Sequence, residues 1–292
     1  MKMRTEREMM ELILGVAQRD ERILAVYMNG SRTNPNVPRD IFQDYDIVYV
    51  IKENRPFIED KSWIDQFGPR LYMQQPDEID KSLGKPVDFA ACYGWLIQFA
   101  DGNRLDLHVE PLEKTNILED KLCKILLDKK GILPAILEPT DVDYRVKRPS
   151  AAQYEACVNE FWWCLNNVAK GLWREEIPYV QDMLALVRGE LIKMLSWRVG
   201  CDTDFSVSVG KSGKYLYRWL PKEDWRDFLG TYASGKTEEI WESVMTMCGL
   251  FDRTAREIER RLHYSYDIQT AEGGWGHLRQ VRQLPKDAEG VY

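Results

Sequence analysis

The sequence holds 292 residues, of which 44% are hydrophobic and 30% are charged, and its formal net charge is -7. This length suits two ordinary domains, since domains cluster near ~100 to 150 residues. No apolar run approaches the ~18 residues of a membrane helix, and the first residues are charged, so we expect a cytoplasmic protein with no membrane partner. The acidic balance argues against a nucleic-acid partner, because binding a phosphate backbone needs clustered Lys and Arg, and it suits a small cationic partner better.

The cysteines and histidines give no sign of a zinc site. Six cysteines lie far apart without a CxxC pair, and the three histidines lack zinc-ligand spacing. We therefore expect reduced, buried thiols.

The N-terminal half alternates helix and strand signals. Thr5 and Glu8 have capping-box spacing before apolar residues at helical period, which predicts a helix over 5–18. Strand patterns, a polar loop and the turn-forming Asp101-Gly102-Asn103 follow, and they predict strands over 23–29 and 44–51, a loop over 32–43, and a hairpin of 94–100 with 104–109. We expect a mixed α/β unit with a central sheet.

After Pro149 the pattern changes to long helical periods. Ser150 and Gln153 have capping-box spacing, and apolar residues then recur at helical offsets, so a helix should begin at Ser150. Further helices are expected over 177–199, 222–229 and 237–263. We place the domain boundary within 147–150, and interpret most aromatic residues of these helices as core.

Three acidic residues and a Gly-Ser turn form the informative combination. Gly30-Ser31 follows the first predicted strand, Asp44 and Asp46 open the next strand, and Asp106 lies on a later one. Because side chains alternate along a strand, Asp44 and Asp46 project from one face, roughly 7 Å apart along the backbone. Asp106 alternates with apolar neighbours, so a neighbouring strand can bring a third carboxylate beside the first two.

Three converging carboxylates repel one another unless cations neutralise them. An all-oxygen set matches Mg²⁺, and two such ions stabilise the attacking and leaving oxygens of a displacement at phosphorus. We predict that Asp44 and Asp46 bind metal, and that Asp106 is either a metal ligand or the base for an acceptor hydroxyl. A DxD pair alone is common on exposed strands, so the interpretation rests on the ordered combination.

With Gly30-Ser31 followed by Asp44-Tyr45-Asp46, the chain resembles the polymerase-β-type nucleotidyltransferases. Longer segments resemble the aminoglycoside 6-adenylyltransferases, which inactivate streptomycin. The segments that carry this likeness are 3–10, 20–23, 30–34, 42–47, 101–107, 159–162, 209–211 and 261–264.

The resemblance implies ATP as donor, Mg²⁺ as cofactor and an aminoglycoside acceptor. It also implies an N-terminal nucleotidyltransferase domain over 1–148 and a helical acceptor-binding domain over 149–292. The positions that match the family are the acidic triad Asp44, Asp46 and Asp106, the triphosphate-holding turn Gly30, Ser31 and Arg32, and the basic segment Lys211, Lys214 and Tyr215. A solvated loop is an equally good interpretation of the two lysines.

The positive charge of streptomycin indicates which residues should bind the acceptor. Streptomycin carries two guanidinium groups, so its pocket should present carboxylates that accept paired hydrogen bonds. Asp182, Glu175 and Glu176 are the candidates, and Trp173 is either a stacking face or part of the core.

The stretch Leu107-His108-Val109-Glu110 departs from the uncharged run that the family favours here. It places His108 and Glu110 on the face of Asp106. The extra acid can bind a cationic acceptor or perturb the base.

Three hypotheses remain. The leading one is transfer of AMP from ATP to a streptomycin hydroxyl. The second keeps this chemistry with another small-molecule or protein hydroxyl as acceptor, and the third is a ligand-binding protein without turnover.

Overall fold

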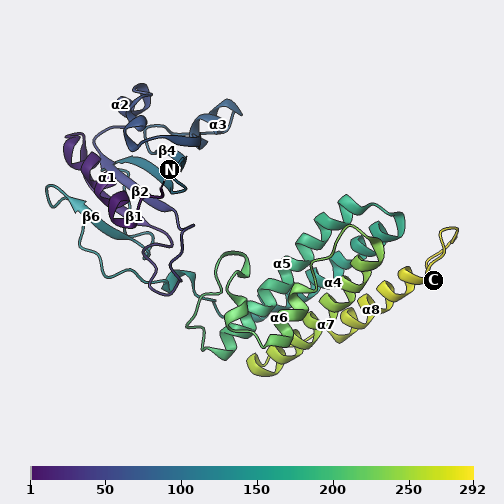
Figure 1. The fold of residues 1–292 in the computed structure, drawn as a ribbon. Helices are drawn as coiled ribbons and strands as arrows, with labels where there is room; N and C mark the ends of the chain where they lie inside the picture. Colours follow the sequence, from purple (N-terminus) through teal and green to yellow (C-terminus); the bar gives the residue numbers. More distant parts are fainter. Residues whose placement is uncertain (1) are drawn as a thin grey trace. The chain divides into compact units, whose positions relative to one another are not determined.

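The computed structural model describes residues 2–292, which divide into two compact units, one ending at Asp143 and the other beginning at Tyr144 (Figure 1). The first unit is a mixed sheet with helices, and the second is helical. The predicted α/β fold class, with a helical C-terminal half, is therefore confirmed.

The first unit is built on a six-stranded sheet of order β3-β4-β5-β2-β1-β6. Neighbouring strands are antiparallel except β2 and β5, which are parallel. Its elements are α1 (Glu6–Arg19), β1 (Ile23–Asn29), β2 (Tyr45–Ile51), α2 (Arg55–Glu59), η1 (Trp63–Phe67), β3 (Arg70–Gln74), α3 (Pro76–Ser82), β4 (Tyr93–Phe99), β5 (Arg104–Pro111) and β6 (Lys124–Asp128). The short η2 (Val142–Tyr144) spans the boundary between the units.

Helix α1 packs on one face of this sheet. It begins where the capping box predicted, because the Thr5 side chain accepts from the Glu8 backbone N–H and the Glu8 carboxylate accepts from the Thr5 N–H. Alternation along the parallel pair buries one side of each strand in the same core, namely Tyr45, Ile47, Tyr49 and Ile51 of β2 and Leu105, Leu107 and Val109 of β5. The acidic residues of both strands are thereby directed to the opposite face.

The predicted hairpin forms between β4 and β5. Gly102 takes a φ of +94° in its turn, a conformation that glycine adopts without strain. Arg4 donates from its backbone N and Nε to Oδ2 of Asp101 at 3.1 and 2.6 Å. Burial alone would raise the pKa of Asp101, but the hydrogen bonds from Arg4 and Asn103 outweigh it and hold that pKa well below its usual range. The turn is thus tied to the segment that precedes α1.

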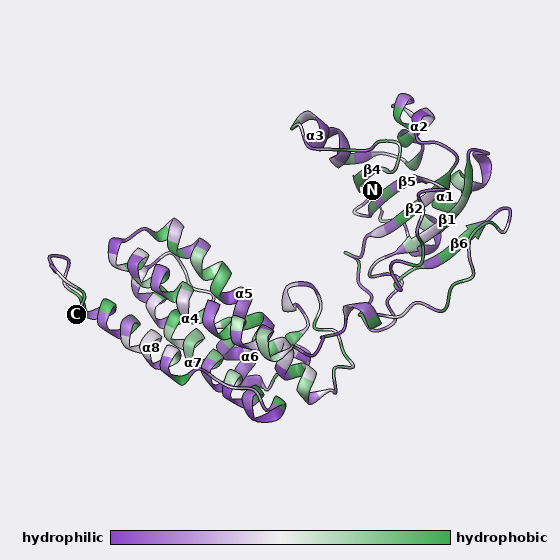
Figure 2. Cartoon of the chain, turned by 180° about the vertical axis from the view of Figure 1, so that it is seen from behind, coloured by the Kyte–Doolittle hydropathy of each residue, from purple (hydrophilic) through white to green (hydrophobic). Residues whose placement is uncertain are grey.

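The second unit consists of amphipathic helices, and along each of them Figure 2 shows hydrophilic and hydrophobic residues interleaved. Ser150 caps the first of them with the predicted capping box. The elements are α4 (Ala151–Arg174), α5 (Ile177–Asp202), η3 (Lys211–Gly213), η4 (Leu216–Arg218), α6 (Lys222–Leu229), α7 (Thr237–Leu262) and α8 (Ile268–Gln283). Helix α8 was not predicted, because its glycines at 273, 274 and 276 weaken the helical pattern.

No helix in residues 2–292 is both long and apolar enough to cross a membrane. All six cysteines are free, and four of them are buried, as predicted. Cys92 and Cys201 are only partly buried, so the prediction of burial was wrong for these two.

Candidate active site

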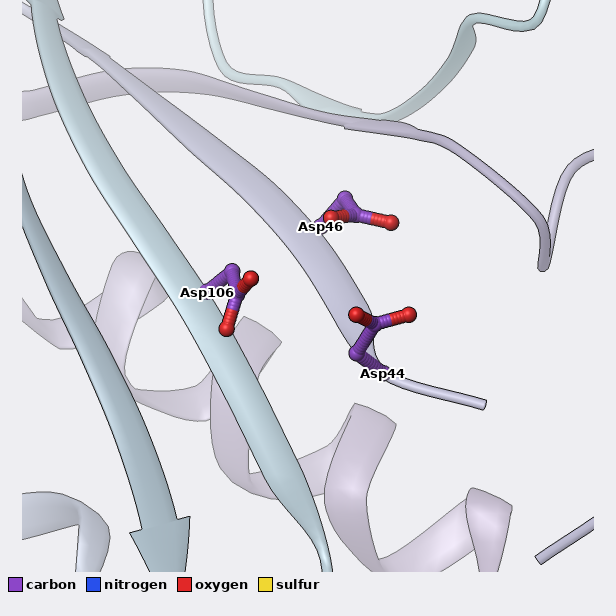
Figure 3. A group of neighbouring side chains, drawn as sticks. All are labelled: Asp44, Asp46 and Asp106. Atoms are coloured by element: carbon purple, nitrogen blue, oxygen red, sulfur yellow. The ribbon is translucent and has the colours of Figure 1, made fainter. Parts of the chain in front are cut away.

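The sheet register brings the three predicted acids together. Asp46 of β2 lies directly opposite Asp106 of β5, and Asp44 stands just before β2 (Figure 3). One carboxylate oxygen from each residue lies within 4.8 Å of the other two. The predicted convergence is confirmed, whereas the strand begins at Tyr45, one residue later than expected.

The charges in this triad are unbalanced. Burial raises the pKa of Asp46 to about 7, with further contributions from the neighbouring charges of Asp44 and Asp106. Arg104 offsets part of this charge, since its Nε and Nη2 donate to the two oxygens of Asp106 at 2.8 and 2.6 Å, and its Nε lies 3.9 Å from Asp44. One guanidinium facing three carboxylates leaves an anionic site that favours a further cation.

Gly30 makes room for the triad. Its φ is +76°, and a Cβ built on it would lie 2.0 Å from Oδ2 of Asp46. The chain then turns tightly, because the Thr33 N–H donates to the Gly30 carbonyl at 3.1 Å and the Asn34 N–H to the Ser31 carbonyl at 3.2 Å. The Gly-Ser turn therefore lies against the carboxylate of Asp46.

Arg32 is buried and bonded within the protein. Its Nε donates to the Asp44 carbonyl at 3.0 Å, its Nη2 donates to the Gln43 carbonyl at 2.7 Å, and its guanidinium carbon lies 3.7 Å from the centre of the Tyr45 ring. These contacts take up the carbonyls just before β2, which explains why the strand begins only at Tyr45. Arg32 thus fixes the backbone of Asp44.

Two further polar residues of this face were missed from the sequence. Arg104 pairs with Asp106, and Asn29 lies opposite Asp46 on the β1 side. The buried side-chain oxygen of Asn29 has no hydrogen-bond partner within the described part of the chain. The available signals were period-two spacing of Arg104 from Asp106, and a polar residue ending the apolar strand Ile23–Asn29.

The donor set fits Mg²⁺. The three carboxylates offer oxygen ligands, and the unpartnered Asn29 oxygen is a fourth hard donor in the same row of the sheet. The raised pKa of Asp46 also favours a bound cation, because a cation would stabilise the ionised carboxylate.

The basic segment of the second unit forms a tight turn. Lys211 and Lys214 are exposed on η3 and at its end, and Tyr215 is partly buried. The ring of Tyr215 has Lys214 Nζ 5.1 Å and the Arg218 guanidinium carbon 4.5 Å from its centre. The turn therefore gathers positive charge around one aromatic ring.

Two of the four acceptor-side candidates, Trp173 and Asp182, lie on α4 and α5, and Glu175 and Glu176 join these helices. Asp182 is exposed on α5. Glu175 ends α4 in a left-handed conformation and pairs with Lys286 at 2.9 Å, while Glu176 lies 4.0 Å from Arg174. Trp173 is partly buried and donates from Nε1 to the Pro285 carbonyl at 3.3 Å. Among these acids, Asp182 is the one without an ion pair within residues 2–292.

The chain is similar to a family of known proteins over most of its length. The sequence model of the family "Streptomycin adenylyltransferase" matches residues 3–281. Proteins named "Aminoglycoside 6-adenylyltransferase" from Bacillus subtilis (strain 168) and Campylobacter jejuni are 37% and 36% identical, covering 90% and 91% of this chain and 93% and 92% of their own length. A crystal structure of an aminoglycoside 6-adenyltransferase from Bacillus subtilis is 31% identical, covers 97% of this chain and all of its own, and superposes with a TM-score of 0.48. The chain belongs to the streptomycin adenylyltransferase family.

Proposed function

We propose that this protein transfers AMP from ATP to a hydroxyl of streptomycin, with Mg²⁺ as cofactor and pyrophosphate as the other product. The observation that carries the proposal is the meeting of Asp44, Asp46 and Asp106 within 4.8 Å beside the Gly30 turn. The relatives named aminoglycoside 6-adenylyltransferase support an aminoglycoside as acceptor. We propose a cytoplasmic location, where ATP is available.

In the reaction, the acceptor oxygen forms a bond to the α-phosphorus while the bond from that phosphorus to the pyrophosphate oxygen breaks. Asp44 and Asp46 would hold Mg²⁺, which when bound neutralises charge on the triphosphate and on the leaving oxygen. Because Gly30 has no Cβ, phosphate oxygens can approach the backbone N–H groups of this turn and the hydroxyl of Ser31. Arg32 acts here by fixing Asp44.

The position of Asp106 allows two alternative roles. It can complete the metal site, or it can take the proton that the acceptor hydroxyl loses. Arg104 donates to both of its oxygens, which fixes the orientation of this carboxylate. Metal binding by Asp106→Asn separates the roles, since a ligand substitution weakens it and a base substitution leaves it unchanged.

We also propose ligand-binding roles for residues of the second unit. Lys211 and Lys214 present exposed cations for the phosphates, and Lys214 and Arg218 both lie near the ring of Tyr215. Asp182 is our first choice for a guanidinium of the acceptor, because its carboxylate is exposed and not taken up by a protein cation. Glu175 and Glu176, which lie beside Lys286 and Arg174, and Trp173, which donates to Pro285, are secondary candidates.

The direct test is pyrophosphate release by purified protein with Mg²⁺, ATP and streptomycin, with mass spectrometry of the acceptor. We expect release that depends on all three and a product heavier by one adenylyl group. Pyrophosphate release with another aminoglycoside but not with streptomycin would mean that the other aminoglycoside is the acceptor. Absence of release with every acceptor tested would leave a binding protein without turnover.

A further inference from the structure

The face of the sheet that carries the triad continues past it along β5. Asp106, His108 and Glu110 alternate with buried Leu107 and Val109, so all three lie on one face. Glu110 lies four positions after Asp106, which is about 13 Å along a strand. A second carboxylate site thus shares the face of the candidate active site.

The intervening residue, His108, leans onto β4. It lies directly opposite Gly94, and a Cβ on Gly94 would come within 2.5 Å of the imidazole Cδ2 and 2.7 Å of Nε2. Only glycine leaves this space, so the ring can lie over the β4 backbone. His108 remains partly exposed, as does Glu110, although Val48 and Val50 opposite them on β2 are buried.

The carboxylate of Glu110 is held by neutral neighbours. The Tyr27 hydroxyl, on β1, donates to Oε2 of Glu110 at 2.9 Å. Burial and the charge of Glu110 raise the pKa of Tyr27, and the same two causes raise the pKa of Cys92 to about 12, so both groups keep their protons. Glu110 therefore stays oriented by groups that carry no charge.

No cation pairs with this carboxylate within residues 2–292, although Glu110 is partly buried. A desolvated carboxylate without a counterion is costly, and a cationic ligand that reaches it recovers that cost. The exposed Glu113 lies three residues further on, past the end of β5, so it has the same charge outside this face.

We propose that Glu110 is an anionic subsite of the acceptor pocket, which binds a guanidinium or ammonium group of the molecule whose hydroxyl reacts at the triad. This inference rests on the proposed function. It assigns to this chain an acceptor that extends from the triad toward Glu110, four positions further along β5.

The test compares Glu110→Gln with Glu113→Gln in the full chain, using streptomycin, ATP and Mg²⁺. The glutamine oxygen can still accept from Tyr27, so the fold is retained. We expect Glu110→Gln to raise the KM and Kd for streptomycin by about tenfold or more, with kcat and the KM for ATP unchanged. Glu113→Gln should leave all of these values unchanged.

An unchanged KM for streptomycin in Glu110→Gln overturns the inference, and so does a loss confined to kcat. If Glu110→Gln fails to fold, Tyr27→Phe decides, since it keeps the carboxylate but removes its orienting donor. A KM raised by a smaller factor supports the subsite, and an unchanged KM means that Glu110 only satisfies Tyr27. Because wild-type turnover is measured in the same assay, failure of the proposed function itself is seen separately, as no product from the wild type.

Discussion

Gly30 and Asp46 approach so closely that a Cβ on Gly30 would lie 2.0 Å from Oδ2 of Asp46. Position 30 therefore sets both the turn after β1 and the place of a metal-binding candidate on β2. We predict that Gly30→Ala lowers kcat/KM for AMP transfer by at least about 100-fold, because Asp46 must move by more than 1 Å.

A matched control for this variant is Gly84→Ala. Gly84 has nearly the same φ, +75°, but nothing lies within 4 Å of its added Cβ. It should cost about 1 kcal/mol in the free energy of unfolding through backbone strain alone, with activity retained. Equal activity of the two variants would contradict the steric account.

The metal-free protein should be stabilised by Asp46→Asn at pH 8. The pKa of Asp46 is raised from 3.8 to about 7, so folding favours its protonated form, and stability falls as the pH rises through that interval. This pKa shift corresponds to a change of at most about 4 kcal/mol in the free energy of unfolding. In EDTA at pH 8 we expect a higher Tm for Asp46→Asn, a much smaller difference at pH 5, and no turnover with Mg²⁺. A lower Tm at pH 8 would mean that Asp46 stabilises the empty fold.

Arg104 competes with metal for the triad, since it donates to both oxygens of Asp106 and reaches toward Asp44. Its side chain is nearly half exposed, so the pair contributes less than about 1 kcal/mol. We therefore expect Arg104→Gln to lower the half-saturating Mg²⁺ concentration by up to about fivefold, measured by titration of turnover. A higher half-saturating concentration would instead show that Arg104 helps to bind the metal-triphosphate complex.

The hairpin turn should make the first unit sensitive to acid. Asp101 accepts from Arg4 and Asn103, and its lowered pKa means that its contribution is present above pH ~4 and lost as the pH falls further. Asp101→Asn should reduce the free energy of unfolding by about 2–4 kcal/mol at pH 7. Denaturant unfolding checks this, with Arg7→Gln as control, because Arg7 and Glu11 form an exposed pair that is worth less than about 0.5 kcal/mol. Equal losses in both would show that the Asp101 network adds nothing.

Acceptor binding should distinguish two acids of the second unit. Asp182→Asn is expected to raise the KM for streptomycin about tenfold or more with little change in kcat, because it removes an exposed, unpaired carboxylate. Glu175→Gln, whose carboxylate is paired with Lys286, should change it little. Steady-state kinetics at saturating ATP measures both, and the opposite order would move the pocket toward the end of α4.

The elements that sequence analysis predicted are those with strong local signals. Capping boxes located the starts of α1 and α4, and alternation placed Asp46 and Asp106 on the face opposite the core. Helix α8 and the short strands β3 and β6 were missed, since glycines interrupt the first and the two strands at the sheet edges are held mainly by pairing.

The site was predictable only in part, because it depends on the pairing of strands that are distant in the sequence. The convergence of the acids follows from residue spacing once two strands are neighbours, but that β2 and β5 pair in parallel, with Asp46 opposite Asp106, depends on the whole sheet. Residue spacing also does not predict which groups an arginine side chain bonds to. Arg32 proved to be bonded to backbone carbonyls, and Arg104 to pair with Asp106.

We expect Asp44, Asp46 and Asp106 to bind a divalent cation together, beside a triphosphate. A crystal structure with Mn²⁺ and a non-hydrolysable ATP analogue, read by the anomalous signal of the metal, tests it most directly. Metal contacting these carboxylates, with phosphate oxygens at the Gly30-Ser31 turn, is the expected result. Metal and triphosphate bound elsewhere, with Arg104 still paired to Asp106, would contradict this expectation.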